Sequence, residues 1–254
     1  LMPLAGLLVI VLVFSILTGG KIIQPRNLKL IISQMYVLMI ASTGVFMIMT
    51  VGGLDFSQGS ILGLTSIIIC WVSKYNIGLA IAAGIAAGAV MGAVNGLFHV
   101  KFKIASFIVT ICTMYLFRGL CEYITTSGPI AAAPAVVALD LTWLKLVLTL
   151  AVLAVGYFLY HYTRLGPDLR AIGAGETAAR FSGCRPDLTK LLVYVAAGAL
   201  TGFASFINVV KVGSITGTAG SQMETQILIA LVLGGLPISG GAQDVLARFF
   251  AEWF

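Results

Sequence analysis

The chain has 254 residues, of which 59% are hydrophobic and only 9% are charged, and its mean hydropathy is +1.06. Soluble domains are about one quarter charged, so water is not the main solvent of this chain. At about 20 residues per spanning helix, the length accommodates roughly seven to nine membrane crossings. The net charge of +6 comes from basic residues in short loops between apolar runs, which is typical of membrane topology and disfavours a nucleic-acid partner.

The apolar runs are continuous, whereas membrane β-barrels show alternating segments of about ten residues. We therefore predict an all-α, polytopic transmembrane helical bundle of about 8–10 helices, some of them short or broken, forming one domain over residues 1–254 embedded in a lipid bilayer. The first run has no basic leader or small-residue cleavage site and is expected to be a spanning helix. The apolar segments fall at about 1–18, 30–51, 57–73, 77–98, 104–120, 143–162, 191–210 and 225–238.

The metal-binding and redox residue types are sparse and scattered. The four cysteines show no Cys-x-x-Cys spacing, and His99 and His161 each stand alone at a segment end. This pattern predicts no metal site and no disulfide, and with no clustered acids it disfavours a membrane enzyme.

The longest polar stretch, residues 163–190, holds a third of the basic residues, which predicts a cytoplasmic position. The loop with Lys101 and Lys103 lies two crossings earlier and falls on the same side. The loop with Lys21, Arg26 and Lys29 disagrees, since three apolar segments separate it from Lys101.

Two explanations for this disagreement stay open. Either the charge rule is broken at that loop, or one segment does not cross the membrane. The candidate for the latter is the region around Asp55, where TVGGLDFSQGS interrupts the apolar run with polar residues and glycines.

Glycine patterns point to helix packing and to broken helices. The run 77–98 has glycine at every fourth residue, which favours close approach of a neighbouring helix, with dimerisation through that face as the alternative. Residues 52–59 and 234–241 both read G-G-L-x-apolar-S-x-G, as the two halves of an internally repeated transporter do. The packing glycines are Gly84, Gly88, Gly92 and Gly96.

Residues 176–183 (ETAARFSG) predict a short helix within the cytoplasmic stretch. Glu176 suits the positive end of the helix, and Gly183 followed by Pro186 ends it. With small Ala178 and Ala179 and a projecting Phe181, the helix is suited to a groove on another protein. An ordinary interfacial helix is the alternative.

Five motifs in order resemble the ribose-type sugar permeases of ATP-binding-cassette (ABC) importers. The segment from Ala171 to Gly183 resembles A-I-G-x-x-E-x-A-A-R-x-S-G of that family. The other four are GGLDFSQGSILGL, GAVMGAVNGLF, IASFIVTICTMYLFRG and AGSQMETQILIALVLGGLPISGGA. The resemblance covers nearly the whole chain.

This resemblance implies a multi-pass protein of the cell inner membrane that works as a permease dimer, homomeric or heteromeric. An extracytoplasmic solute-binding protein delivers a sugar or sugar-like solute, and a separate ATPase subunit binds ATP and Mg. No cofactor and no catalysis are expected in this chain, which lacks a G-x-x-x-x-G-K-[ST] nucleotide loop. The coupling residues implied are Gly175, Glu176, Ala178, Ala179, Arg180, Phe181 and Gly183.

Polar residues inside apolar runs are the candidates for the translocation pathway. A carboxylate at mid-membrane costs on the order of 3 kcal/mol, so Asp55 should face protein, water or a helix end. Amide and hydroxyl groups are able to bind a hydroxylated solute, though interhelical hydrogen bonds explain them equally well. Arg118 is expected to reach the lipid headgroups. The pathway candidates are Asp55, Ser57, Asn95, Ser106, Phe107, Thr110 and Glu224.

The chain departs from the family pattern at a few positions. Ala105 replaces a proline, and Thr225-Gln226 replaces a leucine commonly followed by aspartate. Family members continue beyond the S-G-G motif, so the C-terminal part is expected to be incomplete. A branched-chain amino-acid or nucleoside permease remains the alternative within ABC importers, and an ion-coupled secondary transporter or channel remains the alternative outside them.

Overall fold

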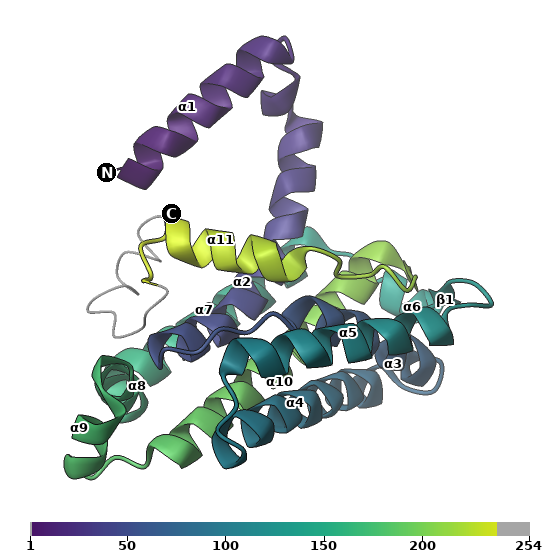
Figure 1. Ribbon diagram of the computed structural model, residues 1–254. Helices are drawn as coiled ribbons and strands as arrows, with labels where there is room; N and C mark the ends of the chain where they lie inside the picture. The colour runs from purple at the N-terminus through teal and green to yellow at the C-terminus, as the bar shows by residue number, and fades with distance from the viewer. Residues whose placement is uncertain (1, 238–254) are drawn as a thin grey trace.

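The computed structural model describes residues 2–237 and confirms an all-α bundle (Figure 1). The only strands described there are β1 (Ile130–Ala131) and β2 (Ser214–Ile215), which pair antiparallel. The helices are α1 (Met2–Leu17), the 3-10 helix η1 (Lys21–Ile23), α2 (Pro25–Thr50), α3 (Gln58–Ser73), α4 (Ile77–Lys101), α5 (Ser106–Ile124), α6 (Pro134–Val137), α7 (Thr142–Tyr162), α8 (Leu165–Ala174), α9 (Glu176–Phe181), α10 (Pro186–Val212) and α11 (Met223–Leu233).

Five of these helices, α2, α4, α5, α7 and α10, are long and apolar enough to cross a membrane, while α3 and α11 are shorter apolar helices. Each predicted apolar segment corresponds to one of the helices. Helices α2 and α10 begin five residues before the predicted segments, at Pro25 and Pro186. Proline is favoured in the first helical turn, where its missing N–H has no intrahelical partner in any case.

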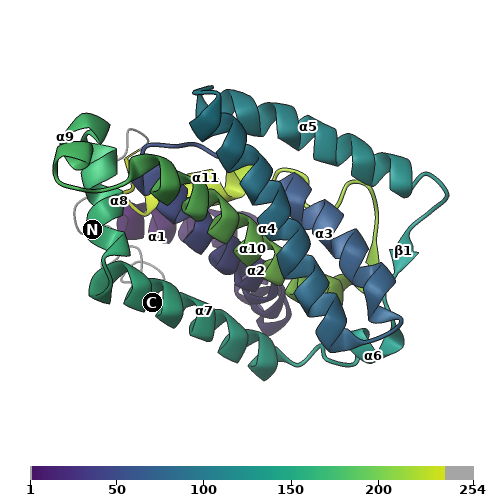
Figure 2. The ribbon, with the colours of Figure 1, turned by 90° about the horizontal axis from the view of Figure 1, so that it is seen from below.

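The bundle has two distinct ends. In Figure 2, α8 and α9 lie at one end and α6 and β1 at the other, here called the α9 end and the β1 end. Helix α2 runs parallel to α7, because Thr43 lies against Gly156 and the rings of Phe46 and Tyr160 are 5.2 Å apart. Since α7 leads into α8, both helices run toward the α9 end.

The basic loops lie in two places, one at the α9 end and the other at the start of α2. Lys101 and Lys103 lie at the α9 end, as the sequence predicts, where they line a cleft of about 870 Å³ together with Glu176 and Arg180. The basic residues of the 21–29 loop lie on an arm, formed by α1 and the first turns of α2, that extends away from the bundle (Figure 1). The segment around Asp55 leads into α3, which runs back toward the β1 end but, at 16 residues, is shorter than the five candidate spanning helices.

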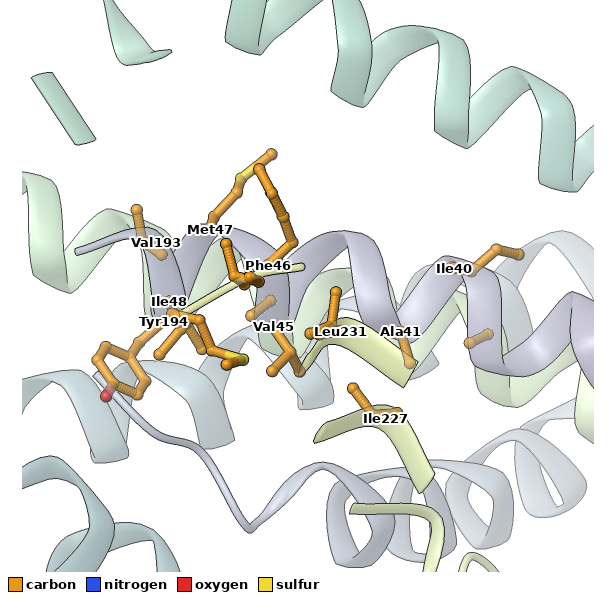
Figure 3. Close-up of a cluster of buried hydrophobic side chains, with 14 of the residues drawn as sticks. Ile40, Ala41, Val45, Phe46, Met47, Ile48, Val193, Tyr194, Ile227 and Leu231 are labelled. Carbon is orange, nitrogen blue, oxygen red and sulfur yellow. The ribbon is translucent and has the colours of Figure 1, made fainter. Parts of the chain in front are cut away.

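The apolar core lies where α2, α10 and α11 meet. Figure 3 shows Val45 and Phe46 of α2, Tyr194 of α10, and Ile227 and Leu231 of α11 in one buried cluster. Helix α10 is therefore covered by its neighbours, while α5 and α7 on opposite sides of the bundle (Figure 2) expose large apolar side chains. Such an exposed apolar surface suits a lipid environment.

Helices α4 and α10 are in backbone contact along the glycine ridge. A Cβ atom on Gly88 would lie 2.1 Å from the carbonyl oxygen of Gly198, and one on Gly92 would lie 2.1 Å from that of Tyr194. Gly84 faces Gly202 in the same antiparallel manner. Within the chain, the ridge therefore faces α10, which contributes glycines of its own to the contact.

Replacing Gly92 with leucine should force α4 and α10 apart. Over-packing of this kind costs about 1–3 kcal/mol, which corresponds to a decrease in Tm of about 2–12 °C for the detergent-solubilised protein. The matched control is Gly119→Leu, because a Cβ atom at Gly119 meets nothing within 4 Å. Equal Tm values for the two variants would contradict the close α4–α10 contact.

Candidate functional site

The chain between α2 and α3 forms an extended break inside the bundle. From Gly53 to Ser57 it has no helical structure, and it follows α10 from the level of Tyr194, which lies against Gly53, to the level of Thr201, which bonds Gln58. Helix α3 thus begins near the middle of α10 and covers only the half of the bundle toward the β1 end. Backbone groups in such a break lack the intrahelical hydrogen bonds that a membrane interior requires.

Asp55 closes the break by capping α3. Its Oδ1 atom accepts hydrogen bonds from the Ser57 backbone N–H at 2.7 Å and from the Ser57 hydroxyl at 2.6 Å, and its Oδ2 atom accepts one from Gln58 Nε2 at 2.6 Å. The carboxylate is buried beside the positive end of α3, which stabilises negative charge.

The Asp55 network continues into two further helices. Asn95 of α4 donates from Nδ2 to the Ser57 hydroxyl oxygen at 2.7 Å. Thr201 of α10 donates to Gln58 Oε1. All of these side chains are buried, so the network fixes α3, α4 and α10 relative to one another. Asn95 Oδ1 has no hydrogen-bond partner among the described residues.

Hydroxyl groups of α5 accept hydrogen bonds from backbone N–H groups of the break. The N–H of Leu54 donates to the Ser106 hydroxyl at 3.0 Å, and that of Phe56 donates to the Thr110 hydroxyl at 3.2 Å. Phe107, between them in sequence, is half-exposed and does not join this group. Five of the seven predicted pathway residues therefore gather at the break, namely Asp55, Ser57, Asn95, Ser106 and Thr110.

Glu224 lies outside the break, where the first turns of α3 and α11 meet. A Cβ atom on Gly59 would lie 1.9 Å from Glu224 Oε2 and 2.3 Å from the carbonyl oxygen of Gly220. Gly220 has a φ of +74°, which favours glycine. From this Gly59–Gly220 junction, α3 runs toward the β1 end and α11 runs toward the α8 side (Figure 1).

Arg118 of α5 holds the loop that leads into α11. It donates to the Ala219 carbonyl at 3.2 Å and the Ser221 hydroxyl at 2.9 Å, and its guanidinium lies 3.6 Å from Glu224 Oε1. These contacts give Arg118 a structural role within the chain. The loop carbonyls, which no sequence pattern places beside α5, bind the guanidinium within the chain.

The two G-G-L-x-apolar-S-x-G segments occupy different positions. The first, residues 52–59, is the break before α3, whereas the second starts at Gly234, after α11, and continues beyond the described residues. In the described part, the loop that leads into α11 is 216–222, which does not share the motif.

The α9 end carries the other group of predicted site residues. Glu176 accepts hydrogen bonds from Lys190 at 2.6 Å and from Arg180 at 3.0 Å, and Arg180 also binds both carboxylate oxygens of Asp187 at 2.9 Å. The hydrogen bonds from Lys190 and then Arg180 lower the pKa of the Glu176 carboxyl. These ion pairs join α9 to the first turns of α10.

Helix α9 presents an apolar side chain to its surroundings. Ala179 is buried against the bundle, while Phe181 is 89% exposed and Ala178 is exposed beside it. Gly175 precedes the helix in extended conformation, and Gly183 follows it with a φ of +86°, a conformation that favours glycine. The seven predicted coupling residues therefore form one short helix and its two ends.

Comparison with known protein families decides the class of this architecture. A family model described as branched-chain amino acid transport system / permease component matches residues 27–243. The chain belongs to this permease family. As a member with five candidate spanning helices, it is a multi-pass protein of the cell membrane.

Several curated relatives of this permease are import permeases. The chain is 34% identical to the ribose import permease protein of Bacillus subtilis (strain 168), over 94% of this chain and 77% of the relative. It is 28% identical to the fructose import permease protein of Bifidobacterium longum (strain NCC 2705), over 86% and 69%, respectively. It is 25% identical to the autoinducer 2 import system permease protein of Escherichia coli (strain K12 / DH10B), over 99% and 76%. No solved structure matches the chain.

Potential metal-ligating side chains are scattered in the described part of the permease. Within residues 2–237, no group of three or more His, Cys, Asp or Glu side chains is arranged to hold one. The candidate sites therefore consist of hydrogen-bonding groups, ion pairs and an exposed aromatic ring.

Replacing Gly59 with alanine should disrupt the Gly59–Gly220 junction. The added methyl group overlaps the Gly220 carbonyl, so α3 and α11 must separate, and we expect a decrease in Tm of about 2–12 °C from an over-packing cost of about 1–3 kcal/mol. Gly119→Ala in α5 is the control with free space around it. An unchanged Tm for Gly59→Ala would show that the two helix starts lie farther apart.

Proposed function

We propose that this chain is the membrane subunit of an ABC importer for a sugar or a sugar-like small polar solute. In this proposal the α9 end faces the cytoplasm, where a separate ATPase subunit binds α9 and supplies the ATP and Mg. An extracytoplasmic binding protein delivers the solute at the β1 end, and a second permease completes the translocation unit. The chain itself catalyses no reaction.

The observation that carries the proposal is the exposed α9 helix. An aromatic ring that is 89% exposed suits an anchor in a pocket of another protein. The position of this ring relative to α10 is fixed, because ion pairs join α9 to α10. They are formed by Glu176, Arg180, Asp187 and Lys190. The 163–190 stretch is basic, in agreement with a cytoplasmic location.

A chain of packing contacts and hydrogen bonds connects α9 with the middle of the bundle. Movement of α9 would displace α10, which contacts α4 through backbone and bonds Gln58 through Thr201. Gln58 in turn binds Asp55 at the break. We infer that nucleotide-driven movement of α9 reaches the break through α10, since packed helices move as rigid units.

The cargo is inferred from the relatives. Their names specify ribose, fructose and autoinducer 2, although the family description names branched-chain amino acids. The polar groups of the described bundle are mainly hydroxyls and amides, which suit a hydroxylated solute better than an aliphatic side chain.

Replacing Phe181 with alanine should weaken binding of the ATPase. Loss of an interface anchor typically costs about 2 kcal/mol or more, so we expect about a 30-fold weaker association, measured by co-purification with the ATPase subunit at graded concentrations. The matched control is Tyr75→Ala, because Tyr75 is 87% exposed between α3 and α4, away from the α9 end. Wild-type association of the Phe181 variant would argue against α9 as the docking helix.

Uptake measurements test the cargo. Cells that express the full-length permease with its ATPase and binding protein should accumulate radiolabelled ribose or fructose, and a variant ATPase without hydrolysis should abolish this uptake. Labelled leucine is the control solute. Accumulation of leucine alone would assign the permease to amino acids and reject the sugar proposal.

A further inference from the structure

A polar pocket lies between α2, α10 and α11, on the β1 side of the Gly59–Gly220 junction. Its volume is about 240 Å³, and Gly220 and Met223 are among the residues that line it. Sites for drug-sized ligands measure about 300–1,000 Å³, so this pocket suits one smaller solute.

Amide and amine groups line this pocket. Gln34 comes from α2, Asn208 and Lys211 from α10, and Gln226 from α11. Of these, only Asn208 forms a side-chain hydrogen bond with another described residue, at 3.5 Å to the Ser66 hydroxyl. Lys211 forms no ion pair within 4 Å among the described residues, and it interacts at longer range with Asp140 and Lys145.

Gln34 and Gln226 are exposed, and Asn208 and Lys211 are half-buried. Amides and an ammonium are unfavourable against lipid and are retained where they face water, protein or a solute. Three elements that are distant in sequence converge here with donors and acceptors, while Leu38, Leu62 and Met223 provide apolar surface. Pockets that bind small solutes combine a few convergent polar groups with apolar walls in this way.

We infer that this pocket is a solute subsite, in which a hydroxylated molecule of monosaccharide size binds before it passes the Gly59–Gly220 junction. The amides of Gln34, Asn208 and Gln226 donate to and accept from sugar hydroxyls, and Lys211 donates to a hydroxyl oxygen. The apolar side chains contact the C–H faces of the sugar ring. This inference rests on the proposed function, because it assigns a place to the cargo of the same importer.

Protection of an introduced thiol tests the subsite directly. Gln226→Cys places a thiol in the pocket, and Thr225→Cys places one at the neighbouring exposed position of α11 that does not line it. The full-length permease, assembled with its ATPase in membrane vesicles without ATP, is treated with a small methanethiosulfonate reagent. Modification at each introduced thiol is followed by peptide mass spectrometry. The probe sugar is whichever of ribose or fructose the cells accumulate, and leucine is the control solute.

The sugar should slow modification of the Gln226→Cys thiol by a factor of 1 + [L]/Kd, about tenfold when its concentration is ten times its Kd. The Thr225→Cys thiol should react at the same rate with and without sugar. Unprotected Gln226→Cys in a system that imports the sugar would overturn the subsite and leave the proposed function intact. Equal protection of both thiols would also overturn it, since that result reflects a general change of the protein. If the wild-type system imports neither sugar, the proposed cargo fails and the subsite fails with it.

Discussion

The constraint on which this structure depends is the absence of water partners for backbone groups inside a membrane. The break between α2 and α3 exposes N–H groups that no helix satisfies, and the chain compensates with hydroxyls from Ser106 and Thr110 and with the Asp55 cap. Each of these partners is buried, so the break persists as an ordered element. Residues that look like a polar pathway in sequence are therefore, in this conformation, the groups that make a broken helix possible.

The glycine contact between α4 and α10 gives the same region its rigidity. Backbone atoms of the two helices approach so closely that a single methyl group at Gly88 or Gly92 has no space. In lipid there is no hydrophobic driving force between helices. Dispersion contacts, which close approach makes possible, stabilise the helix pair instead. Because α4 also carries Asn95 to Ser57, the position of α4 on α10 and the geometry of the break depend on each other.

The sequence was sufficient to predict the fold class, the apolar helices and the short helix α9, because hydrophobic runs and glycine positions are local signals. It did not predict α8, whose Gly166 and Pro167 are typical of a loop. It also did not predict the contacts of Arg118 or the meeting of Gly59 with Gly220. Those contacts join segments that are about a hundred or more residues apart, and no single-sequence pattern specifies which loop folds back onto which helix.

The two short apolar helices, α3 and α11, are held in the bundle by contacts of different kinds at the Asp55 network and at the Gly59–Gly220 junction. The network is closed by hydrogen bonds from α3, α4 and α10, so opening it exposes several buried polar groups at once. At the junction, α3 meets the loop into α11 by close packing, with Gly59 against Gly220 and Glu224, Leu62 against Gly220 and Gly63 against the Ala219 carbonyl. Glu224 Oε2 at the junction and Asn95 Oδ1 in the network both lack a hydrogen-bond partner among the described residues. Separating the two helix starts therefore breaks these packing contacts, but among the described residues no hydrogen bond joins α3 to α11. The network therefore ties α3 to α10 by hydrogen bonds, whereas α3 and α11 are held together by close packing.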